Sequence, residues 1–115
     1  MIKTQINEKR CARTEMAHRL SLPACCPITA NPRPGSEITI SYQPAGHLLE
    51  VIALRAYIDS YQGGRGPVRS MEGMIQSIAQ DCANSVWVSV CVTAELVLDP
   101  DQRMSVECRA YPNAG

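Results

Sequence analysis

Two side chains of this 115-residue chain could do chemistry together, the thiol of Cys26 and the carboxylate of Glu72. Cys26 lies in the run Cys25-Cys26-Pro27-Ile28-Thr29, within a stretch that prolines at positions 23, 27, 32 and 34 keep irregular. A thiol on such a loop can be held exposed, and its thiolate attacks electrophilic carbon near neutral pH. Glu72 stands at the head of an amphipathic segment. An enzyme is therefore the first hypothesis.

Hydrophobic periodicity predicts the elements that position these two side chains. Apolar residues alternate with polar ones over residues 14–22, 36–42, 86–98 and 104–110, a pattern typical of strands, with a turn at 99–102. Helical spacing predicts helices over residues 48–61 and 70–82, the second with Ser70 as N-cap and with Asn84-Ser85 as its end. The fold class is therefore α+β, in the order strand-strand-helix-helix-strand-strand. We expect a four-stranded antiparallel sheet with both helices on one face.

Composition limits the classes of function. The length indicates one domain, residues 14–115, after a flexible N-terminal segment of residues 1–13. Eleven Lys and Arg balance eleven Asp and Glu, so charge alone should not draw the monomer to nucleic acid or to an anionic membrane. No segment approaches the ~20 apolar residues of a membrane span, and the first residues lack the apolar core of a secretory signal. These features predict a cytoplasmic protein with no membrane partner.

The six cysteines fit reduced thiols better than a disulfide framework, because no export signal accompanies them. Cys82, Cys91 and Cys108 fall inside apolar patterns and are expected to be buried. No Cys-x-x-Cys or His-x-x-x-His pair is present, so no metal site is predicted.

An ordered series of motifs resembles the 7-cyano-7-deazaguanine reductase (QueF-type) family of tunnelling-fold proteins, which includes a QueF-like archaeosine-synthase branch. The series is Cys26-Pro27-Ile28-Thr29, Ser41-Tyr42-Gln43-Pro44, Leu48-Leu49-Glu50, Leu54-Arg55-Ala56-Tyr57-Ile58-Asp59-Ser60-Tyr61 and Met71-Glu72. It covers about residues 14–111. The resemblance implies the tunnelling fold (T-fold) and an annular homo-oligomer, as one ring or stacked rings, with the pocket shared between subunits.

The resemblance also implies roles for individual residues. Cys26 matches the nucleophile that adds to the nitrile of 7-cyano-7-deazaguanine to form a thioimide, with Cys25 as the competing thiol. Glu72 matches the carboxylate that anchors the base, and a carboxylate can accept both neighbouring N–H groups of a guanine-type edge. Met71, which replaces the histidine that usually precedes this carboxylate, is a candidate for substrate binding, and so are Ser60 and Glu50.

Two departures from the family pattern bear on the reaction. Arg33 stands where the family has its proton-carrying aspartate, and it is a candidate catalytic residue. Its guanidinium could depress the pKa of a nearby thiol or hold an anion, but it cannot shuttle protons. The alternative is that Arg33 is an ordinary solvated charge. The NADPH motif has lysines two and five residues after its glutamate, whereas Ile52 and Arg55 follow Glu50 here. Arg55 remains a candidate cofactor contact, or half of an exposed helix pair with Glu50.

The weakened motif favours amidine formation without a cofactor, as in archaeosine synthesis, on a free base or on a base already in tRNA or DNA. Reduction with NADPH, as in queuosine biosynthesis, is the alternative. A non-catalytic deazapurine-binding or structural subunit is the third hypothesis.

Overall fold

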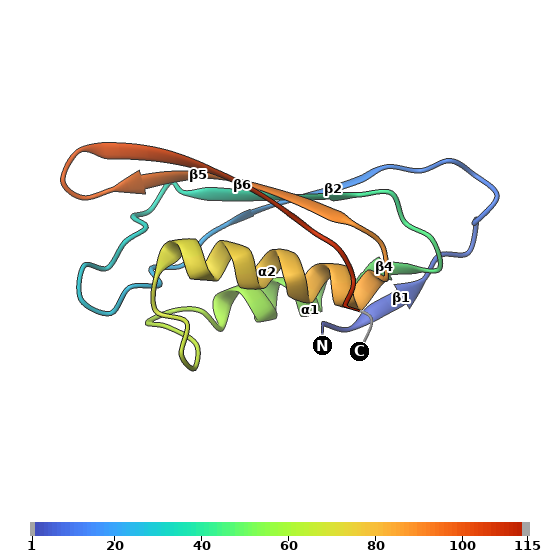
Figure 1. Ribbon diagram of the computed structural model, residues 1–115, viewed down its shortest axis with the longest axis horizontal. Helices are drawn as coiled ribbons and strands as arrows, with labels where there is room; N and C mark the ends of the chain where they lie inside the picture. Colours follow the sequence, from blue (N-terminus) through green and yellow to red (C-terminus); the bar gives the residue numbers. More distant parts are fainter. Residues whose placement is uncertain (1, 114–115) are drawn as a thin grey trace.

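The structure, a computed structural model, describes residues 2–113 and arranges them as two helices and six strands (Figure 1). In chain order these are β1 (Thr4–Ile6), β2 (Met16–Ser21), β3 (Glu37–Tyr42), β4 (His47–Leu49), α1 (Val51–Asp59), α2 (Met71–Val86), β5 (Val90–Leu98) and β6 (Gln102–Ala110). Neither helix in this part of the chain is long and apolar enough to cross a membrane.

The main sheet has four antiparallel strands in the order β2-β3-β5-β6. Both helices cover the same face of this sheet, as the strand and helix order led us to expect (Figure 1). The sheet is open, with β2 and β6 at its edges, and does not close into a barrel within the described chain. The α+β class is therefore confirmed.

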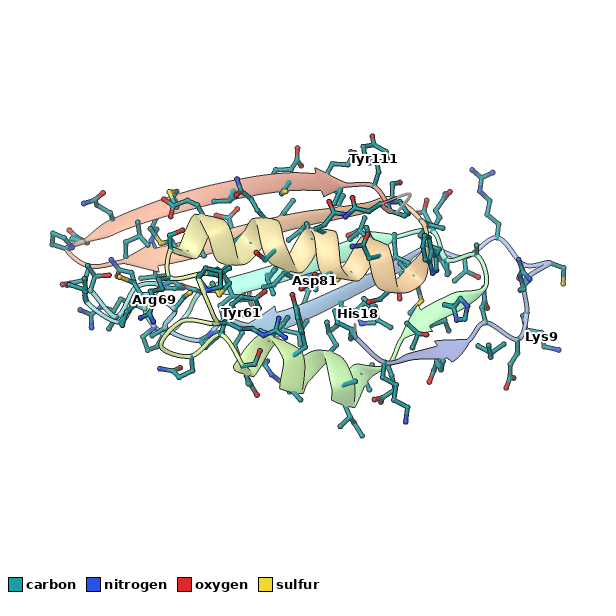
Figure 2. The ribbon with its side chains drawn as sticks, turned by 60° about the horizontal axis from the view of Figure 1, so that its bottom comes forward. Lys9, His18, Tyr61, Arg69, Asp81 and Tyr111 are labelled. Carbon is teal, nitrogen blue, oxygen red and sulfur yellow. The ribbon has the colours of Figure 1, made fainter. Side chains whose placement is uncertain are left out.

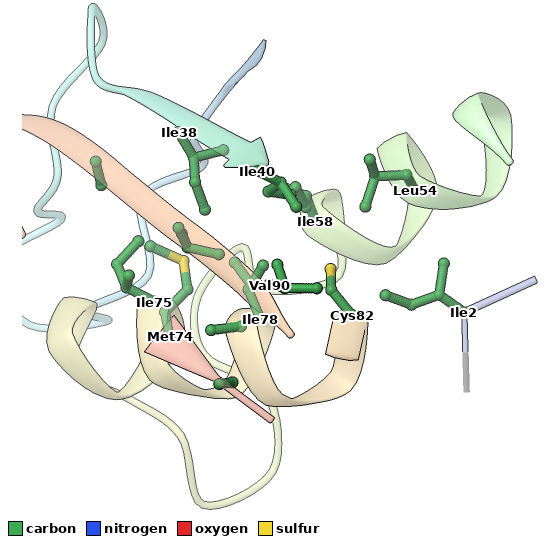
Figure 3. Close-up of a cluster of buried hydrophobic side chains, with 14 of the residues drawn as sticks. Ile2, Ile38, Ile40, Leu54, Ile58, Met74, Ile75, Ile78, Cys82 and Val90 are labelled. Carbon is green, nitrogen blue, oxygen red and sulfur yellow. The ribbon is translucent and has the colours of Figure 1, made fainter. Parts of the chain in front are cut away.

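The core lies between the sheet and the helices, where the inward-facing residues of the strands pack against the apolar face of α2 (Figure 3). Every second residue of β3 and β5 faces inward, so Ile38, Ile40 and Val92 are fully buried while their polar neighbours face away. Helix α2 adds residues spaced by three and four positions, of which Ile75 and Ile78 have no exposed surface.

A short two-stranded sheet of β1 and β4 was not predicted. Thr4 pairs with Leu49, and the neighbouring Ile2 is buried, so part of the segment that we expected to be flexible, residues 1–13, forms a paired strand. The predicted helix over residues 48–61 starts later, because Leu49 belongs to β4. Glu50 is instead its N-cap, and its carboxylate accepts hydrogen bonds from the backbone N–H groups of Ile52 and Ala53.

Helix α2 also continues past the predicted break at Asn84-Ser85. Within the helix the Ser85 hydroxyl donates to the Asp81 carbonyl at 2.7 Å, and the Asn84 side chain accepts a hydrogen bond from Gln80 at 3.0 Å, so both polar residues fit a helical backbone. The helix ends at Val86, and its C-cap Trp87 has a left-handed φ of 58°. The strand predicted from residue 86 therefore starts only at Val90.

Candidate functional site

Residues 25–31, which we call the cysteine loop, fold back on themselves through backbone hydrogen bonds. The backbone N–H groups of Cys25 and Cys26 both donate to the carbonyl of Asn31 at 3.0 Å, and Ala30 N–H donates to the carbonyl of Cys26 at 2.9 Å. The Asn31 side chain in turn accepts from the backbone N–H of Asp99 at 3.0 Å and donates to its carbonyl at 3.3 Å. The cysteine loop is thereby fixed to the turn between β5 and β6.

The two adjacent cysteines have opposite environments. Cys26 is half-buried, and its Sγ accepts a hydrogen bond from Thr29 N–H at 3.5 Å. The Thr29 hydroxyl and the N–H groups of Thr29 and Ile28 lower the pKa of the Cys26 thiol because they stabilise the thiolate. Cys25 is fully buried and donates to the Ser70 carbonyl at 3.7 Å; burial raises the pKa of this thiol. Of the two thiols between which the sequence left the choice open, Cys26 is therefore the more accessible and the more easily ionised.

The start of α2 brings the carboxylate to the same place. Ser70 is the N-cap, as predicted, and its hydroxyl accepts from Gly73 N–H at 3.0 Å. Glu72 lies in the first helical turn, where a negative charge is favourable. Because the Ser70 carbonyl also accepts from Cys25, the cap joins the cysteine loop to the beginning of α2.

An open cavity of about 670 Å³ lies between these two segments. Its lining comes from the cysteine loop, from the residues before α2 and from the first turn of α2: Cys26, Thr29, Asn31, Pro67, Val68, Arg69, Ser70, Met71, Glu72 and Gly73. The volume is within the range of about 300–1,000 Å³ that small-molecule sites occupy. One protomer therefore supplies Cys26, Met71 and Glu72 to a single cavity.

The cavity contains the Cys26 thiol, whose pKa is lowered, and two side chains of opposite charge, Glu72 and Arg69. Within residues 2–113 no hydrogen bond or ion pair engages the Glu72 carboxylate, so it is available to a ligand. Arg69 is the one cation among the lining residues, and Figure 2 labels it at the end of the molecule where α2 begins. Sequence reasoning did not select Arg69, Thr29 or Asn31 as site residues. Only Thr29 carried a signal, because it closes the Cys-Pro-Ile-Thr motif.

Arg33 does not line this cavity. Its guanidinium lies 3.2 Å from the Asp99 carboxylate, and its backbone N–H donates to the Val97 carbonyl at 2.7 Å. The Arg33 side chain thus contacts the β5–β6 turn through Asp99, and it is not among the residues that line the cavity with Cys26.

Ser60, Glu50 and Arg55 also lie outside the cavity. Ser60 is the C-cap of α1, and its hydroxyl donates to the Tyr57 carbonyl. Arg55 donates to the Asp59 carboxylate and, at 2.9 Å, to the Ser21 carbonyl, so the expected helix pair forms with Asp59 instead of Glu50. Each of these three polar side chains already has a local structural partner.

One other cysteine, Cys91, also lines a cavity with a carboxylate, a space of about 570 Å³ that includes Glu15 and Arg109. There the Glu15 carboxylate already accepts a hydrogen bond from the Gln43 side chain at 3.1 Å. All six cysteines are free; Cys82 is buried as expected, and burial raises its pKa to about 12, whereas Cys91 and Cys108 are only half-buried. Across residues 2–113, no three His, Cys, Asp or Glu side chains come together in a way that could hold a metal ion.

The fold and the cavity define a small α+β protein that places an ionisable cysteine and an unpaired carboxylate around one open site. Neither a scan against protein-family models nor a search of the curated proteins finds a match to this chain. The function is therefore inferred from the cavity and from the sequence motifs.

Proposed function

We propose that this protein converts the nitrile of 7-cyano-7-deazaguanine, through a thioimide at Cys26, into an amidine. The observation that carries the proposal is that Cys26 and Glu72, which matched the nucleophile and the base anchor in sequence, line the same cavity. The cavity is large enough for a bicyclic base, and Cys26 has the lowered thiol pKa that nucleophilic attack requires.

In the first step the Glu72 carboxylate accepts the adjacent N–H groups of the guanine-type edge, which orients the ring. The Cys26 sulfur then bonds to the nitrile carbon, one carbon–nitrogen π bond breaks, and the thiol proton ends on the nitrogen. In the second step ammonia bonds to the same carbon, the sulfur leaves, and the thiol recovers its proton. The sum is nitrile plus ammonia giving amidine, with no change in oxidation state.

The surroundings of Glu50 and Arg55 favour this product over reduction by NADPH. The Glu50 carboxylate is engaged by the N-terminus of α1, and the Arg55 guanidinium by Asp59 and the Ser21 carbonyl. A dinucleotide phosphate that bound Arg55 would have to displace its contacts with Asp59 and the Ser21 carbonyl. Loss of NADPH absorbance in the presence of the nitrile would select the reductase alternative.

One observation favours a non-catalytic role as the second candidate. Arg33, which replaces the family's aspartate, is held by Asp99, and Glu72 is the one acid among the residues lining the cavity. A protein without a proton-carrying acid near the sulfur could bind a deazapurine and stop there. Tight binding of the base without a covalent adduct would select this candidate.

We also propose the tunnelling fold and a homo-oligomeric ring. The open edges at β2 and β6 support this assembly, because unpaired strands can continue the sheet into neighbouring subunits. The substrate is the free base or the same base carried in a nucleic acid.

The test is intact-mass measurement after incubation with 7-cyano-7-deazaguanine, without and with ammonia. The wild type should gain the full mass of the base, and ammonia should remove the adduct and release the amidine. Cys26→Ala should gain nothing, while Cys11→Ala, which removes an exposed thiol outside the cavity, should behave like the wild type. An adduct that persists in Cys26→Ala would refute the proposal.

A further inference from the structure

The segment 62–69 between the two helices, which we call the strap, forms part of two cavities. Pro67 and Val68 line the cavity of Cys26 and Glu72, and the same two residues line a second cavity of about 430 Å³ that also contains Tyr61, Arg65 and Asp81. The position of the strap therefore sets one wall of the cavity that contains Cys26 and Glu72, which we call the reactive cavity.

Two glycines at the start of the strap have left-handed backbone conformations. Gly63 and Gly64 have φ values of 74° and 101°, a region that other residues rarely adopt. Beyond them Arg65 and Val68 exchange backbone hydrogen bonds of 2.8 and 2.9 Å, which close a four-residue turn. The turn is therefore held by its own hydrogen bonds, and the glycine N–H groups before it donate to the carbonyls of Ala24 and Tyr61 at 2.9 Å.

The Arg65 side chain fastens this turn to both helices. Its guanidinium carbon lies 4.9 Å from the centroid of the Tyr57 ring and 5.5 Å from that of Tyr61, and its Nη1 lies 3.8 Å from the Asp81 carboxylate. The Tyr57 hydroxyl donates to the same carboxylate and lies 2.9 Å from the Tyr61 hydroxyl. Tyr57 belongs to α1 and Asp81 to α2, and Figure 2 labels Tyr61 and Asp81 where the two helices face each other.

We propose that Arg65 is a latch that holds the strap closed and so sets how large a molecule can reach Cys26. Arg65 is a positioning residue, because its contacts are to Tyr57, Tyr61 and Asp81 and it does not itself line the reactive cavity. The inference rests on the proposed function in one respect, that the substrate enters this cavity; the effect of Arg65 on access to Cys26 does not depend on which substrate it is.

The test compares the alkylation rates of Cys26 by a small reagent, iodoacetamide, and by a bulky dye-linked maleimide. A Cys11→Ala background and peptide mapping assign the modified thiol. Arg65→Gln should raise the maleimide rate about fivefold, the factor that one exposed cation–π contact supplies, and leave the iodoacetamide rate nearly unchanged. Arg65→Lys, which keeps a cation near the rings, should restore most of the discrimination. Arg103→Gln, an exposed site on β6, is the matched control and should have no effect.

Hydrogen exchange gives a second measurement on the same proteins. The amides of Gly63 and Arg65, which donate to Ala24 and Val68, should exchange faster in Arg65→Gln than in the control, while the amides of β5 should not change. If Arg65→Gln does not fold, Tyr61→Leu replaces it, since it removes one of the two rings. An unchanged ratio of the two alkylation rates in a folded variant would overturn the latch. No nitrile is used, so this result is separate from the outcome of the adduct test.

Discussion

Replacing Ser70 with alanine should lower the free energy of unfolding by about 1 kcal/mol, the typical value of an N-cap. The Ser70 hydroxyl accepts the Gly73 N–H at 3.0 Å, and alanine leaves that donor without its side-chain partner. For a domain of this size the change corresponds to a fall in Tm of about 3–6 °C. The first turn of α2 carries Glu72, so the cap also fixes the carboxylate of the proposed site.

Gly73 makes this prediction more specific. A Cβ at position 73 would lie 2.9 Å from the Ser70 hydroxyl oxygen, so the hydroxyl must turn away and lose the cap. Alanine gains up to about 1 kcal/mol over glycine inside a helix, and the lost cap offsets this gain. Gly73→Ala should therefore be nearly neutral in the wild type and stabilising by about 1 kcal/mol in the Ser70→Ala background, a coupling of about 1 kcal/mol.

Urea unfolding followed by circular dichroism measures all four proteins of this cycle. Ser41→Ala on β3, combined with the same glycine substitution, is the control pair and should be additive, since no contact between positions 41 and 73 exists in the described structure. If Gly73→Ala stabilises both backgrounds equally, the cap does not have the geometry described here.

Two further substitutions test the site, and a third tests the N-cap of α1. Thr29→Val should move the pH profile of Cys26 alkylation to higher pH, because the Thr29 hydroxyl lowers the pKa of this thiol, whereas Thr93→Val on β5 should not move it. Glu72→Gln should weaken binding of 7-cyano-7-deazaguanine by about 10- to 100-fold, the worth of a charge-assisted hydrogen bond, and leave iodoacetamide alkylation of Cys26 unchanged; equal affinity would exclude Glu72 as the anchor. Glu50→Gln should lower Tm at neutral pH without changing Cys26 alkylation. Backbone N–H groups hold the pKa of Glu50 below its usual value, so its stabilisation is present above the unfolded pKa and lost as pH falls through the folded pKa; the Tm difference between wild type and variant should shrink over that range.

The elements that local patterns determine were predicted well. Residues 36–42 and 104–110 alternate strictly, and β3 and β6 form there with the expected inward faces. Ser70 has the residue type of a cap directly before an apolar helical stripe, and α2 begins after it. The resemblance implied that Cys26 and Glu72 act at one pocket shared between subunits, and within one protomer the two residues line a single cavity.

The features that escaped prediction depend on contacts between distant residues. The strand pair of β1 and β4 joins Thr4 to Leu49, and strands of three residues are too short to have a detectable period. Arg33 has its ion-pair partner in a turn far along the chain, and the Arg65 latch needs side chains from both helices. Such partners follow only from the tertiary fold.

The measurement that tests the account most directly is a crystal structure of the wild-type protein soaked with 7-cyano-7-deazaguanine. The account predicts continuous density from the Cys26 sulfur to the nitrile carbon, with the guanine-type edge against the Glu72 carboxylate. A base bound away from position 72, or attached to another cysteine, would contradict it.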